Sequence, residues 1–133
     1  MSVALDHTII FVRDRWASAR FLADILGLKV EPEWGPFAPV RTGNGVTLDF
    51  ADSKDFRPQH YAFLVSEPEF DAALSRIKSD GVKFYSSFDG SGPGEINHLY
   101  GGRGVYFEDP NGHLFELITA PYGPTPQRWA AGG

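Results

Sequence analysis

The sequence predicts an α+β fold, in which two copies of a strand-helix-three-strand (βαβββ) unit build an open, eight-stranded, barrel-like sheet with the helices outside. Two observations carry this prediction. A histidine opens a β-rich run at His7 and again at His60, and the helix-like stretch after each run ends at a glycine, Gly27 and Gly81. Each copy is too small to bury a core alone, so we expect the function to lie where the copies meet.

The first unit is expected to span residues 4–52. A β-rich run leads into a helix that begins near Asp14 and ends at Gly27, a residue type that accepts the left-handed conformation at a helix end. Asn44-Gly45 is a strong signal for a tight hairpin turn. Three short strands are expected after the helix, at 29–33, 39–42 and 45–51.

The second unit is expected to span residues 57–120, after a polar linker. Ser66 and Glu69 have the spacing of a capping box, in which each side chain bonds the backbone of the other residue at a helix start. Strands are expected at 82–86, 103–108 and 113–119. The glycine-rich connection 87–102 is expected to form a hairpin or lid. The whole chain, 1–133, is expected to be one domain with an irregular tail at 121–133.

Composition narrows the possible partners. The chain has 133 residues, no cysteine and a formal net charge of −5. Scattered basic residues argue against nucleic acid or an anionic membrane as a partner, so we expect a small-molecule substrate. Without cysteine, histidine and carboxylate must carry any metal chemistry. The N-terminus has no signal-peptide pattern and no segment is long and apolar enough to span a membrane, which predicts a cytoplasmic protein.

Alternation along the strands separates an apolar face from a chemically active one, because successive side chains point to opposite faces. The second face is expected to carry nearly all titratable strand residues: His7, Asp49, His60, Tyr106, Glu108 and Glu116. Burying unpaired carboxylates is costly unless a cation compensates. Two imidazoles and one carboxylate suit one divalent metal ion, namely Zn, Fe, Mn, Ni or Co.

Three segments carry a resemblance to a known family: LDH at 5–7, HYAF at 60–63 and VYFEDPNGHLFEL at 105–117. Through them the chain resembles, over residues 4 to about 120, the vicinal oxygen chelate superfamily. That superfamily includes glyoxalase I, extradiol dioxygenases, fosfomycin resistance proteins and bleomycin-binding proteins. The resemblance implies that the metal ligands are His7, His60 and Glu116.

The resemblance also implies roles for two further residues. Aligning the two units places Asp49 at the fourth position of the metal site, where it is a direct ligand, a partner of a ligand, or a solvated carboxylate at the sheet edge. Asp49 or a bound water is the candidate base. Tyr106 stands ten residues before Glu116, at a position that touches substrate in related enzymes, and is expected to orient the substrate.

Departures from the individual subfamilies leave the reaction open. Fosfomycin transferases carry a threonine where this chain has Ile9, and extradiol dioxygenases carry an acid-base histidine before His60 that this chain lacks. Three further residues are candidates for substrate binding, and each has a structural role as the alternative. His98 is a cavity group or a loop histidine, Arg103 meets an anionic substrate or stands at a hairpin edge, and Trp34 lines the mouth of the cavity or packs.

Two function classes follow from these observations. The first is a metal-dependent enzyme that chelates two neighbouring oxygens of a small organic substrate and acts as a lyase, isomerase, transferase or dioxygenase. The alternative is a metal-free drug-binding resistance protein of the bleomycin-binding type. In both cases we expect a homodimer, because two open half-sheets need partners at their edges.

Overall fold

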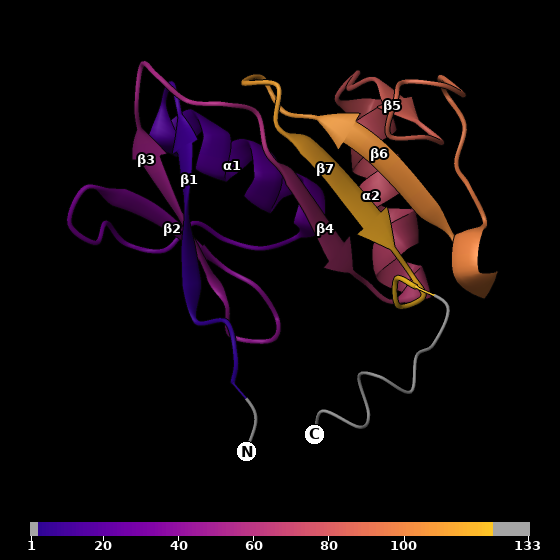
Figure 1. The fold of residues 1–133 in the computed structure, drawn as a ribbon, viewed down its shortest axis with the longest axis horizontal. Coiled ribbons are helices and arrows are strands. Elements are labelled where there is room, and N and C mark those ends of the chain that lie inside the picture. Colours follow the sequence, from indigo (N-terminus) through magenta and orange to yellow (C-terminus); the bar gives the residue numbers. More distant parts are fainter. Residues whose placement is uncertain (1–2, 124–133) are drawn as a thin grey trace. The chain divides into compact units, whose positions relative to one another are not determined.

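The computed structural model describes residues 3–123, so most of the tail predicted at 121–133 lies outside the described residues. The chain divides into two compact units (Figure 1). Residues 5–59 together with 109–113 form one, and residues 60–108 together with the segment from 114 onward form most of the other. Between residues 3 and 123, no helix has the length and apolar character needed to cross a membrane.

The unit of residues 5–59 holds one helix on a three-stranded sheet. Its elements are β1 (His7–Val12), α1 (Arg15–Leu26), β2 (Phe37–Arg41) and β3 (Thr47–Asp52). The strand order is β1-β3-β2, in which β1 runs parallel and β2 antiparallel to β3. Helix α1 begins and ends as predicted. The Asp14 carboxylate accepts hydrogen bonds from the N–H groups of Trp16 and Ala17, and Gly27 has a φ of 71°.

The unit that begins at His60 repeats this order. Its elements are β4 (His60–Leu64), α2 (Glu67–Ser79), β5 (Phe84–Tyr85), the short 3₁₀ turn η1 (Leu99–Gly101), β6 (Gly104–Glu108) and β7 (Leu114–Ile118). The strand order is β4-β7-β6-β5, and β4 runs parallel to β7. The capping box predicted at the start of α2 is confirmed, because both Ser66 and Glu69 bond the other's backbone N–H.

One predicted strand is reduced to a single bridge. Of the segment 29–33, only Val30 pairs, with Val40, and one further backbone hydrogen bond follows from Glu31 to Pro39. Pro32 has no N–H to continue the ladder. The described residues therefore form two sheets, of three and four strands, without a closed barrel. The α+β class is confirmed, whereas the single eight-stranded sheet is not.

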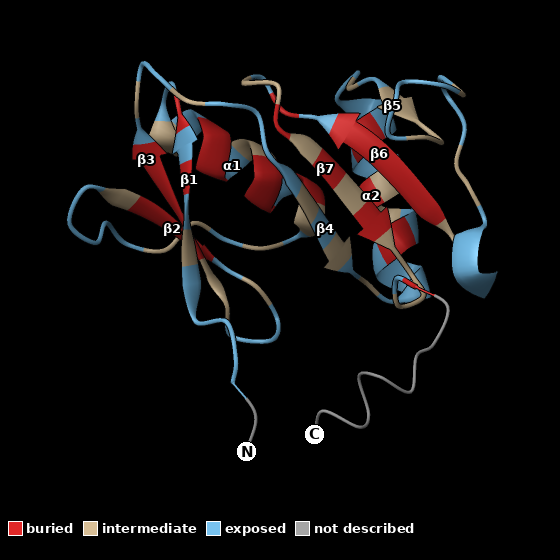
Figure 2. Cartoon of the chain, in the orientation of Figure 1, coloured by how far each residue is buried: buried red, intermediate tan, exposed pale blue. Residues whose placement is uncertain are grey.

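Alternation along the strands predicted most of the core, although the expected apolar residues Val46, Phe63 and Val65 are only half-buried, and Asp49 and Tyr106 of the opposite set are buried. Figure 2 shows buried residues concentrated on β3 and β6 and on the inner sides of the helices. The apolar set is less than 5% exposed at Ile10, Val12, Leu48, Phe50, Val105, Phe107, Phe115 and Leu117. The opposite strand face carries the polar site residues together with exposed apolar side chains such as Ile9, Phe11 and Leu64.

The turn between β6 and β7 belongs to the unit of residues 5–59. Its Asn111 donates from Nδ2 to Ser18 Oγ on α1 at 2.8 Å and accepts at Oδ1 from the Arg13 N–H at 3.0 Å. His113 is 1% exposed, accepts from the Gln59 N–H and contacts the Phe11 carbonyl. His113 stands three residues before Glu116, so strand alternation puts it on the opposite face, and the structure shows it buried in a structural network.

Candidate functional site

Two strands of the second unit bring His60 and Glu116 together. Strands β4 and β7 are parallel, with His60 opposite Leu114 and Ala62 opposite Glu116. His60 Nε2 lies 3.0 Å from Glu116 Oε1, and His60 Nδ1 lies 3.0 Å from the Leu114 carbonyl oxygen. The imidazole therefore has a carboxylate on one side and a backbone acceptor on the other.

This arrangement fits a cation. The Leu114 carbonyl can only accept, so it requires a proton on His60 Nδ1. In the neutral imidazole, Nε2 then carries a lone pair that faces a carboxylate oxygen, and two acceptors in contact repel unless a proton or a metal ion lies between them. A backbone carbonyl that fixes the tautomer of a histidine is also the usual support of a metal-ligating imidazole. The donor set of Glu116 and His60 thus fits a divalent metal ion.

Tyr106 completes the group in this unit. It lies on β6 directly opposite Glu116, and its ring stacks on His60 with a centroid separation of 6.1 Å and an interplanar angle of 25°. Burial, followed by the negative charge of Glu116 and a hydrogen bond with it, raises the pKa of Tyr106 to about 12. The phenol therefore remains protonated at neutral pH and donates toward the carboxylate.

His7 and Asp49 lie in the first unit, on the neighbouring strands β1 and β3. In the parallel register His7 stands opposite Thr47, and Ile9 stands opposite Asp49. His7 Nδ1 is 2.8 Å from Asp6 Oδ2. That hydrogen bond, together with the charges of Asp6 and Asp49, raises the pKa of His7. A carboxylate on Nδ1 leaves Nε2 as the ligating nitrogen.

Asp49 faces an open pocket of about 550 Å³. The pocket is lined by Asp6, His7, Ile9, Glu31, Pro32, Trp34, Phe37, Pro39, Arg41, Thr47 and Asp49. Asp49 is only 6% exposed, and its Oδ1 has no hydrogen-bond partner. The interpretation of Asp49 as a solvated edge carboxylate is therefore wrong. A buried carboxylate oxygen without a protein partner is free to accept a hydrogen bond from water or from a donor group of a ligand.

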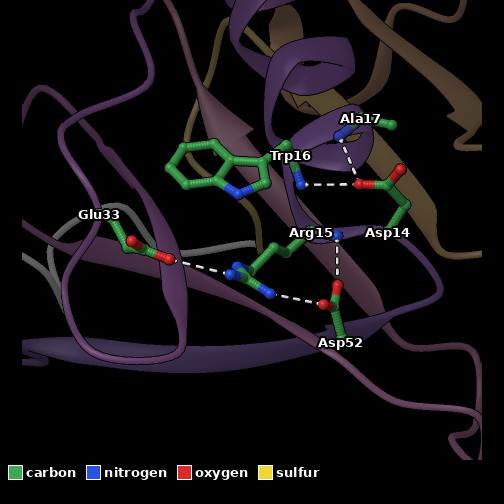
Figure 3. A network of polar contacts seen from close by, with 6 residues as sticks. All are labelled: Asp14, Arg15, Trp16, Ala17, Glu33 and Asp52. Atoms are coloured by element: carbon green, nitrogen blue, oxygen red, sulfur yellow. Dashed lines mark hydrogen bonds and ion pairs between the residues drawn. The ribbon is translucent and has the colours of Figure 1, made fainter.

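Arg15 bonds two acidic residues from different segments of the first unit, Glu33 and Asp52, as Figure 3 shows. Its guanidinium donates to Asp52 at the end of β3 and, at 2.9 Å, to Glu33 in the segment that precedes β2. The Arg15 N–H also donates to Asp52. Since Glu31, Pro32 and Trp34 line the pocket, the ion pair with Glu33 holds their segment against the start of α1. Sequence reasoning missed this network, because its three charged residues are far apart in the chain.

The remaining predicted site residues have different surroundings. His98 is exposed and precedes η1 without capping it. Arg103 forms ion pairs with Glu67 and Asp71 on α2, so its positive charge is paired with two carboxylates of the protein itself. Trp34 is 73% exposed and lines the pocket of Asp49. Among residues 3–123, no three histidine, aspartate or glutamate side chains converge as a metal-binding group.

The fold and these residues define a class: two similar units, each a strand, a helix and then two or three further strands, whose strands present histidine and carboxylate on the face away from the helices. The family model of the glyoxalase/bleomycin resistance protein/dioxygenase superfamily matches residues 4–117, and the chain belongs to this superfamily.

Three relatives show how the chain compares within that class. The solved structure of oxidase ChaP-H2 is 57% identical, with a TM-score of 0.90 over 92% of this chain and 98% of its own. Glutathione transferase FosA from Serratia marcescens is 28% identical over 88% of this chain and 81% of its own length. A mutant of the fosfomycin resistance protein FosX from Listeria monocytogenes, solved with Mn(II) and a dihydroxypropylphosphonic acid, is 24% identical with a TM-score of 0.67 over 91% of this chain and 93% of its own.

Proposed function

We propose that this protein is a metal-dependent enzyme that binds two neighbouring oxygens of a small organic substrate. His60, Glu116 and His7 hold one divalent metal ion. The observation that carries the proposal is the approach of His60 Nε2 to Glu116 Oε1, an imidazole nitrogen and a carboxylate oxygen held together by a proton or by a metal ion, of which the proposal takes the metal ion. The Mn(II) in the related FosX structure supports a metal of this kind, and none of the three relatives is named as a metal-free drug-binding protein.

The surrounding side chains would each contribute one task. When bound, the metal ion supplies Lewis acidity to the chelated oxygens. The unpartnered Oδ1 of Asp49 accepts a proton from the substrate, since its burial in the pocket leaves it with no competing donor. Tyr106 keeps its proton, because its pKa is raised to about 12, and would orient a substrate oxygen by donating to it the hydrogen bond that Glu116 accepts in the absence of substrate.

Among the reaction classes, oxygen-dependent oxidation has the strongest support. The sequence identity to this chain is 57% for the oxidase and 28% for the transferase. The match to the oxidase covers 92% of this chain and 98% of the oxidase. Ile9, which replaces the threonine of fosfomycin transferases, also argues against transfer to fosfomycin. We therefore infer that this chain catalyses an oxidation.

A homodimer is part of this proposal. β1 is an edge strand of the three-stranded sheet, and β4 is an edge strand of the four-stranded sheet. Ile9 and Phe11 on β1 are 40% and 48% exposed, and Leu64 on β4 is 63% exposed. Unpaired edges and exposed apolar side chains favour association with a second copy. Light scattering at micromolar concentration tests it, and a monomer would contradict the dimer without contradicting the metal site.

Metal binding is tested by calorimetric titration of metal-free protein with Mn²⁺, Zn²⁺ and Fe²⁺. We expect about one ion per chain, and His60→Ala to abolish binding. His113→Ala is the matched control, because His113 lies in a network without Glu116. Equal binding by wild type and His60→Ala, or no binding by wild type, would refute the proposal.

The origin of the third ligand can be tested by mixing two variants. If His7 of one chain joins His60 and Glu116 of the other, a mixed dimer of His7→Ala and His60→Ala chains contains one intact site and one site that lacks both histidines. If each site is built within one chain, the mixed dimer contains no intact site. Recovery of metal binding after mixing, with each variant alone as control, therefore identifies a shared site.

A further inference from the structure

Arg41 is the one residue with a permanent positive charge among those that line the pocket of the first unit. It is the last residue of β2 and is exposed at the pocket. Arg15 and Arg103 each pair with two carboxylates. By contrast, no hydrogen bond or ion pair with residues 3–123 engages the Arg41 guanidinium. Its N–H donors are therefore available to a ligand.

Strand register places Arg41 in the same row of the sheet as His7. Arg41 stands opposite Thr47 on β3, and Thr47 stands opposite His7 on β1. Side chains of one row point to the same face of a sheet, and neighbouring strands lie about 4.8 Å apart. Arg41 and His7 therefore flank Thr47 on the face that forms the pocket, with their backbones about 10 Å apart.

The next row of the sheet explains why Asp49 Oδ1 has no partner. Asp49 stands opposite Ile9 on β1 and Pro39 on β2, and neither of these side chains has a hydrogen-bond donor. Arg41 follows Pro39 by two residues, so it is a diagonal neighbour of Asp49, at roughly 7–8 Å. The two charged groups form no ion pair with each other. A free acceptor and a free donor group thus lie at a spacing that a small ligand can span.

Carboxylates dominate the rest of the pocket. Asp6, Glu31 and Asp49 line it together with Arg41, and only Asp6 has a side-chain partner there, His7 at 2.8 Å. These negative charges repel an anionic group from most of the pocket. An anion is therefore favoured beside the guanidinium of Arg41, whereas a hydroxyl group is favoured at Asp49.

We propose that Arg41 is a specificity-determining residue, which binds a carboxylate group of the substrate while Asp49 accepts a hydrogen bond from a hydroxyl group of the same molecule. The inference rests on the proposed function for the metal site, and it adds the substrate class: a hydroxy acid whose carboxylate is separate from the two chelated oxygens. The planar guanidinium offers two parallel N–H donors to a carboxylate, and a lysine would supply the charge without that geometry.

The proposal is tested with 4-hydroxybutyrate and 4-hydroxybutanamide, which have the same length and differ in the charge of one end. Their affinities for the full-length, metal-free chain are measured by NMR titration of the backbone amides. We expect 4-hydroxybutyrate to bind about three- to tenfold more tightly than the amide, with shifts in β2 and β3. Arg41→Gln should remove this preference, and Arg41→Lys should keep part of it.

The matched control is Arg20→Gln, at an exposed arginine of α1 that does not line the pocket. It should keep the full preference for the carboxylate. Arg41→Gln should melt at the same temperature as wild type, because the side chain loses no bond within residues 3–123. Equal affinity of wild type for the two compounds, binding of neither, or an equal loss in Arg41→Gln and Arg20→Gln overturns the proposal.

Titration with Mn²⁺ separates this proposal from the metal site. Arg41→Gln should bind Mn²⁺ like wild type, since the guanidinium is not a metal ligand. Failure of wild type to bind Mn²⁺, with the carboxylate preference intact, refutes the metal site alone. Loss of the carboxylate preference with normal Mn²⁺ binding refutes the role of Arg41 alone.

Discussion

His113 Nε2 lies 2.8 Å from the carbonyl oxygen of Phe11, 102 residues away in sequence. The opposite nitrogen, Nδ1, accepts a hydrogen bond from the Gln59 N–H at 2.9 Å. Both ring nitrogens are thus used to join the turn 109–113 to β1 and to the segment before β4. His113 serves the fold, whereas His60 presents one ring nitrogen to a carboxylate.

His113→Ala is expected to lower the free energy of unfolding by about 2–5 kcal/mol, because it leaves a cavity and removes the partner of two part-buried backbone groups. Chemical denaturation measures the change. His98→Ala, at an exposed loop histidine, is the control and should change stability by no more than about 0.5 kcal/mol. A stability loss of equal size in both variants would contradict the structural role of His113.

Asp49→Asn is expected to stabilise the protein by about 1–3 kcal/mol while it lowers turnover, because it replaces a buried carboxylate whose Oδ1 has no partner. Chemical denaturation and an activity assay on the metal-loaded enzyme give the two values. Asp24→Asn, at an exposed position on α1, is the matched control. A loss of stability in Asp49→Asn would show that the carboxylate serves the fold.

Tyr106→Phe should change the free energy of unfolding by no more than about 1 kcal/mol, since it removes one hydrogen bond and keeps the packed ring. Turnover or ligand binding should weaken. Ultraviolet titration supplies an independent check, because the tyrosine that ionises at about pH 12 should disappear from the curve of the variant. If Tyr106→Phe mainly unfolds the protein, its placement in the site is wrong; Tyr85→Phe on β5 is the control.

Glu69→Gln should lower the melting temperature at neutral pH but not in acid. Hydrogen bonds from Ser66, of which the backbone N–H contributes most, lower the pKa of Glu69 from 4.5. A carboxyl whose pKa is lower in the folded state stabilises the fold above its unfolded pKa, and this contribution is lost as the pH falls through the folded value. The difference between wild type and variant should therefore shrink below pH 4.5, and a difference that stays constant between neutral pH and pH 3 would contradict this role of the Glu69 carboxylate.

Local signals in the sequence predicted much of the fold. Asp14 and Ser66 act on backbone groups two or three residues away, so the starts of both helices could be predicted without knowing any tertiary contact. Strand alternation likewise placed Phe50 and Phe115 in the core and left Asp49 and Glu116 on the opposite face. The interpretation of 29–33 as a full strand was wrong, because Pro32 interrupts its hydrogen bonds.

By itself, therefore, the sequence determined the repeated units, their helix ends, and the histidines and carboxylates that share one strand face, since these depend on periodicity and on neighbours in the chain. Only the tertiary structure decided how deeply Asp49 is buried, that Arg15 joins Asp52 to Glu33, and that Tyr100 contacts Tyr122. These features depend on strand register and on the close approach of segments that are distant in the chain. Neither residue type nor spacing in the sequence predicts which distant segments will come into contact.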